Sequence, residues 1–84
     1  MSVETIKQNA EILNEAVTKF NSYLLELESL NKGKDNTKDK GTKKVFEEQL
    51  FSIKSKIDEL SNYILRIQIN IQKLIDEELH SNVT

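Results

Sequence analysis

His80 is the one histidine of the chain, and it follows Glu77 by three residues, a spacing that puts two side chains on one face of a helix. Di-iron bundles combine Glu-x-x-His pairs from two helices with a glutamate from each of two others. This chain has one such pair, no Cys, and no glutamate in the apolar stripe of its N-terminal half. We therefore predict no metal site and no cofactor. The negative end of a helix dipole, which favours a cation, explains His80 better.

Carboxylates are the other residues that could do chemistry, because several of them lie next to one another. A general acid needs a carboxyl group in a dry pocket that raises its pKa. None of these groups has apolar residues on both sides of its helix face, and a single His supports no nucleophile triad. We therefore predict that the protein is not an enzyme. The groups are Glu26 and Glu28, Glu47 and Glu48, Asp58 and Glu59, and Asp76–Glu78.

Lysines gather between residues 32 and 44, a segment with six Lys, two Asp and no apolar side chain. The segment has a net charge of +4, so the rest of the chain carries −6 of the total of −2. We interpret it as a basic, solvated loop, and keep binding of an anionic polymer through it as a third, weaker candidate function. Nucleic acid is not an expected partner, because the remaining chain is acidic and contains a single Arg, Arg66.

Two apolar stripes flank the basic segment, and each advances by alternating steps of three and four residues. This period of 3.5 is typical of the seam of a coiled coil, in which each apolar side chain fits between four on the partner helix. The chain has no Pro, and both its Gly lie between the stripes. The first stripe is Val3, Ile6, Ala10, Leu13, Val17, Phe20, Leu24, Leu27, and the second is Phe46, Leu50, Ile53, Ile57, Leu60, Ile64, Ile67, Ile71, Leu74.

The stripes predict an all-α fold, an antiparallel two-helix coiled-coil hairpin in a single domain of residues 1–84. We expect a helix over about residues 3–31, the basic loop over about 32–42, and a second helix over about 43–79. Gly33 would occupy the left-handed position just past the first helix, and Thr42 would cap the second. An extended rod with a hinge at the basic segment is the alternative.

Apolar residues outside these stripes indicate a surface for another chain. Neither stripe contains an Asn or Lys that would specify its partner, and five of the nine residues in the second stripe are Ile, which favours bundles of more than two helices. We expect two hairpins to dimerise into a four-helix bundle, or one hairpin to bind another helical protein. The predicted partner-binding residues are Tyr23, Leu30, Phe51, Tyr63, Leu65 and Ile69.

These features predict a non-enzymatic protein–protein interaction module, such as a small coiled-coil adaptor, an assembly subunit or an inhibitor. No apolar run approaches the roughly 20 residues that span a bilayer, and no secretory signal is evident, so we expect no membrane partner and a cytoplasmic location. Export by a route that uses no signal peptide stays open.

In size and hairpin layout, the chain resembles the small helical-hairpin proteins of bacterial type VII and type III secretion. It lacks the Trp-x-Gly turn of the type VII family, since it has no Trp, and the Pro-containing turn of type III needle subunits. The resemblance implies an alternative function, as a small helical chaperone or an exported partner of a secretion system.

Overall fold

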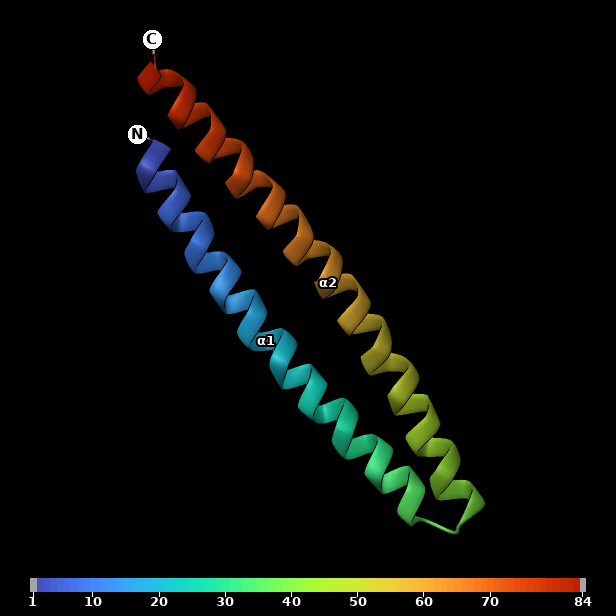
Figure 1. Ribbon diagram of the computed structural model, residues 1–84. Helices are drawn as coiled ribbons and strands as arrows, with labels where there is room; N and C mark the ends of the chain where they lie inside the picture. Colours follow the sequence, from blue (N-terminus) through green and yellow to red (C-terminus); the bar gives the residue numbers. More distant parts are fainter. Residues whose placement is uncertain (1, 84) are drawn as a thin grey trace.

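Two long helices form the protein in a computed structural model that describes residues 2–83, with side chains from residue 3 to residue 80. Helix α1 spans Ser2–Asn36 and helix α2 spans Lys40–Val83. They lie side by side and antiparallel, joined by a tight connection at one end (Figure 1). The Cα atoms extend over 68 × 15 × 13 Å. The prediction of an all-α antiparallel hairpin is confirmed, and the extended rod is excluded.

The connection between the helices is much shorter than predicted. The expected loop over residues 32–42 is wrong, because residues 37–39 are the ones without helical structure. Gly33 lies inside α1, and none of the described residues has a left-handed backbone. Gly33 is needed for a different reason: a Cβ there would lie 2.7 Å from two ring carbons of Phe46. The absent side chain lets the two helices approach closely beside their connection.

Helix α1 continues through the lysines because Lys is a good helix former and finds partners there. Lys32 Nζ lies 3.1 Å from Oε1 of Glu28, one turn earlier in α1, and Lys34 Nζ lies 3.8 Å from Oε1 of Glu47 in α2. Both pairs are exposed and so contribute little free energy each. The charged segment 32–36 can therefore be helical although it has no apolar side chain, because it extends a helix that already packs against α2.

The cap of α2 is Asp39 rather than Thr42. The Thr42 hydroxyl and the Thr42 backbone N–H both donate to Asp39 Oδ2, at 2.7 and 3.0 Å. This places Thr42 at the third position of the helix, where the free N–H groups need acceptors. The hydroxyl bond, followed by the backbone bond, holds the pKa of Asp39 below its ordinary value of 3.8.

Helix α2 contributes the deeper half of the interface. Leu50, Ile53 and Ile67 are buried, and the other six residues of its predicted stripe are all half-buried. The stripe predicted for α2 is therefore the face that packs against α1.

Helix α1 is rotated relative to its predicted stripe. Every seventh residue from Ile6 through Leu13 and Phe20 to Leu27 is half-buried, as expected. The remaining predicted seam residues are wrong, because they are exposed, and the residue before each of the last three faces α2 instead. Neighbouring residues are about 100° apart around a helix, and because the column from Ile6 to Leu27 is kept, the face as a whole turns by about 50°. The exposed residues are Val3, Ala10, Val17 and Leu24, and the residues that replace the last three are Asn9, Ala16 and Tyr23.

The size of the side chains and the path toward the connection explain this rotation. Tyr23 and Leu30 provide more apolar area than the residues that come directly after them. Extending the predicted stripe toward the connection would put Asn31 against α2, whereas the observed face continues through Leu30 to Gly33 and its contact with Phe46. The rotated face therefore keeps apolar contact along most of α1.

The rotation also brings a polar residue into the interface, contrary to the expectation of a seam without Asn. Asn70 Nδ2 of α2 donates to Asn9 Oδ1 at 3.0 Å, and Asn9 Nδ2 donates to the Thr5 carbonyl at 2.9 Å. Sliding of the helices would break the bond between Asn70 and Asn9, although Asn9 would keep its bond to Thr5 within α1. This pair therefore helps to define which residues of α1 and α2 lie level.

Candidate partner-binding surface

The hairpin has a charged face on one side of the α1–α2 seam. A shallow hollow there is shared by both helices, and the Lys19 ammonium lies 5.9 Å from the centre of the Tyr23 ring. Charged residues of α2 border the same hollow, so an apolar partner would have to displace their water. The residues that line it are Lys19, Tyr23, Lys56, Glu59, Leu60, Tyr63 and Arg66.

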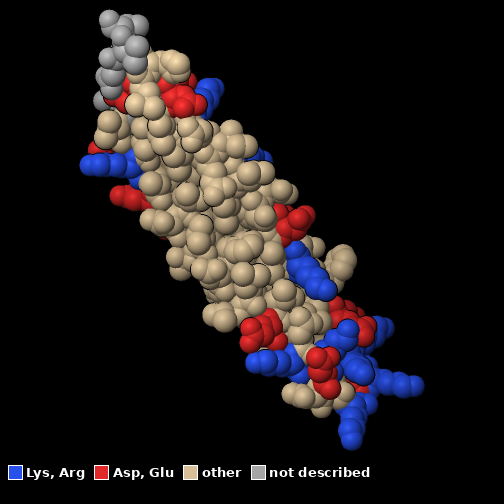
Figure 2. All heavy atoms as spheres, viewed as in Figure 1, with Lys and Arg blue, Asp and Glu red and all other residues tan. Residues whose placement is uncertain are grey.

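The opposite side of the hairpin is an uncharged face. On each helix it consists of residues spaced by seven, which form a column along the helix. The α1 column lies on the other side of the packed face from Tyr23, and the α2 column lies on the other side from Tyr63. Figure 2 shows this face: charged side chains gather toward the hairpin connection, and the middle of the molecule is almost free of them. We define the uncharged face as Val3, Ala10, Val17 and Leu24 of α1 with Ser61, Gln68 and Ile75 of α2.

The predicted partner-binding residues are divided among several sides of the molecule. Phe51, Leu65 and Ile69 are 76%, 54% and 61% exposed and lie on the outer side of α2. Tyr63 is exposed on the charged face. Tyr23 and Leu30 are half-buried, and each borders a hollow together with residues of α2, so they also take part in the packing of the hairpin itself.

Sequence reasoning missed the uncharged face as a surface, because its α1 residues were assigned to the seam. A signal was present in the sequence: α1 carries three parallel apolar columns at seven-residue spacing, and two are sufficient to cover one partner helix. The choice of which column stays outside depends on side-chain volumes, which the period of the pattern does not contain.

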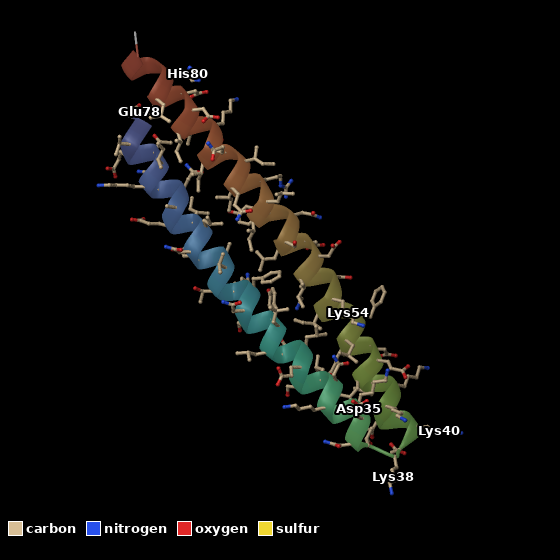
Figure 3. All side chains as sticks on the ribbon, in the orientation of Figure 1. Asp35, Lys38, Lys40, Lys54, Glu78 and His80 are labelled. Atoms are coloured by element: carbon tan, nitrogen blue, oxygen red, sulfur yellow. The ribbon has the colours of Figure 1, made fainter. Side chains whose placement is uncertain are left out.

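The two ends of the hairpin carry opposite charge. Asp35, Lys38 and Lys40 lie at the connection with most of the other lysines of segment 32–44, while Glu78 and His80 lie at the open end (Figure 3). The open end, taken as residues 3–11 and 69–80, has five carboxylates and two lysines. The molecule is therefore basic at the connection and acidic at the open end.

Glu77 and His80 border one hollow on the outer side of α2, away from α1. No group of three or more potential metal ligands comes together among the described residues. Neither helix, over the part that the structure describes, has a stretch apolar enough and long enough to cross a bilayer. Comparisons with protein-family models, with curated proteins and with solved structures returned no match.

Proposed function

We propose that the protein is a non-enzymatic interaction module that presents its apolar helix faces to another helical chain. One observation carries the proposal: among the described side chains, eleven large apolar residues are exposed, and four apolar residues are buried. Isolated exposed apolar residues are normal on a protein surface, but contiguous ones mark interfaces. A hairpin that leaves this many large apolar side chains exposed gains stability from a further helix.

The size of the chain supports the same proposal. A domain of 84 residues without disulfides buries a smaller fraction of its surface than a larger domain does, and small domains often gain stability from a metal, a crosslink or a partner. The two-helix arrangement has one interface instead of the several that a bundle offers. Binding to another helical chain would bury the apolar side chains that the hairpin leaves exposed. An adaptor, an assembly subunit or an inhibitor binds its partner in this way. We place this activity in the cytoplasm.

Site-specific photo-crosslinking in living cells tests this function. A photoreactive residue is placed at Val17 on the uncharged face and at Leu65 on the outer side of α2, with Glu15 as the matched control toward the charged side of α1. We expect a crosslinked product of higher mass from at least one apolar position and little or none from Glu15. Mass spectrometry of the product identifies the partner as a second copy or another protein. Absence of crosslinks at both apolar positions would contradict the proposal.

A further inference from the structure

We propose that the uncharged face binds a second copy of the chain, antiparallel, so that two hairpins form a four-helix bundle with the connection of each beside the open end of the other. This inference rests on the proposed function and names the partner. The face is apolar where its exposed side chains are largest, at Val3, Val17 and Leu24. The residues that define the face carry no charge, so their burial removes no charged group from water. Lys54, seven residues before Ser61 in the same α2 column, borders the face beside Leu24, and its long side chain can keep its ammonium group in water.

The dimensions of the uncharged face suit a stable dimer. From Val3 to Leu24 of α1, a rise of 1.5 Å per residue gives a length of roughly 32 Å, and two helices side by side are roughly 20 Å wide. Their product is about 630 Å² per copy, which lies at the lower end of the area that specific protein–protein interfaces bury on each partner. The face is therefore large enough for a homodimer without any contribution from the outer side of α2.

The charge at the two ends selects the antiparallel arrangement. A parallel dimer would bring two basic connections together, each with a net charge of +4 over residues 32–44. An antiparallel dimer instead keeps the two basic connections at opposite ends of the bundle, and it places Lys32 within one turn of Glu4 and Lys44 within one turn of Glu78 of the other copy. Opposite charges at the edges of an interface guide orientation and reject the alternative.

The side-chain sizes on α1 match themselves under the same symmetry. In a two-fold dimer, the same patch of each copy meets its own equivalent. With the axis at Val17, near the middle of α1, each Val17 meets the Val17 of the other copy. The small Ala10 then lies opposite the larger Leu24, because both are seven residues from Val17. The smallest α1 residue of the uncharged face thus lies opposite its largest, while Val3 lies opposite Asn31.

The two-fold axis that passes Val17 of α1 also passes close to an uncharged-face residue of α2. Asn9 bonds to Asn70, and Gly33 lies against Phe46, so residues whose numbers sum to 79 lie level in the hairpin. Val17 is therefore level with Asn62, and the axis passes within one residue, about 1.5 Å along the helix, of Ser61. A small polar residue at this position allows the two α2 helices to approach closely and bonds readily across the axis. No bulky or charged side chain of the uncharged face obstructs the centre of the proposed bundle.

Cysteine crosslinking of the purified full chain tests this arrangement, because the native sequence has no Cys. Light scattering of the unmodified protein should give twice the 9.7 kDa of one chain. Under mild oxidation, V17C should form a disulfide-linked dimer on the order of tenfold faster than the control S22C, which lies on the outer side of α1. An equimolar mixture of A10C and L24C should crosslink to each other faster than either does to itself.

Other results would overturn the inference. A monomeric mass, or a dimer in which V17C reacts no faster than S22C, would show that this face does not bind a second copy. V17E adds an independent readout: two carboxylates at the axis should abolish the dimer, whereas S22E should retain it. If V17E unfolds the chain, V17C crosslinking still decides. A monomer that photo-crosslinks to another protein would reject this inference and leave the proposed function intact.

Discussion

Helix α2 buries one apolar stripe, whereas α1 carries three apolar columns and turns two of them toward its neighbour. Three residues of α2 are buried, and Ala16 is the one α1 residue that joins them among the described side chains. The α2 residues are buried more deeply because two columns of α1 pack on both sides of the narrower α2 stripe. The column left outside, Val3 to Leu24, is the signature of a helix that has more than one neighbour.

The largest expected effect comes from truncating the centre of the α2 stripe. Ile53 is 3% exposed, and I53A should lower the free energy of unfolding by about 2–4 kcal/mol, since it removes buried methyl groups and leaves a cavity. Leu25 of α1 is 70% exposed, and L25A should change it by less than about 0.5 kcal/mol. Chemical denaturation followed by circular dichroism measures both. Similar losses for the two variants would contradict the observed difference in depth.

Ala16 offers a test of the rotation of α1 itself. Because Ala16 is 6% exposed between the helices, A16L should overpack the interface and lower stability by about 1–3 kcal/mol. The matched control is S22L on the outer side of α1, where the added side chain meets solvent and should be close to neutral. If α1 instead used the stripe with Val17, the A16L variant would be tolerated as well as S22L. Denaturation midpoints of the two proteins decide between these orientations.

The two helices and the α2 seam were predictable because the hydrophobic period determines them, whereas the period alone left the extended rod open as an alternative to the hairpin. Ile53, Ile57 and Ile67 had no competing apolar column beside them. The orientation of α1 was not predictable from period, because its columns differ in side-chain volume and in how far they stay apolar toward the connection. The length of α1 was also hidden: lysines and Gly33 are usual loop residues, and the contact of Gly33 with Phe46, 13 residues away, becomes visible once the helices are paired.

The contact of Gly33 with Phe46 can be measured by a double-mutant cycle. Ala favours a helix over Gly by about 1 kcal/mol, but its Cβ at position 33 would lie 2.7 Å from the Phe46 ring. In the native background we expect the clash to cancel that gain, so that G33A is neutral or destabilising. In the F46L background, which removes those ring carbons, G33A should stabilise the protein by about 0.5–1 kcal/mol. Equal effects in both backgrounds would show that Gly33 and Phe46 do not touch.

The smallest expected effect concerns the start of α2, where Asp39 accepts both bonds from Thr42. D39A should lower the melting temperature at neutral pH, while D39N should retain most of it, because Asn also caps helices well. The pKa of Asp39 is depressed in the folded protein, so its contribution is present above the unfolded value near 3.8 and is lost as the pH falls through the lower folded pKa. The gap in melting temperature between the native protein and D39A should therefore narrow below about pH 4. A gap that stays constant in acid would mean that the ionised carboxylate is not the cap, and that α2, like the interior of α1, is held at this end by packing alone.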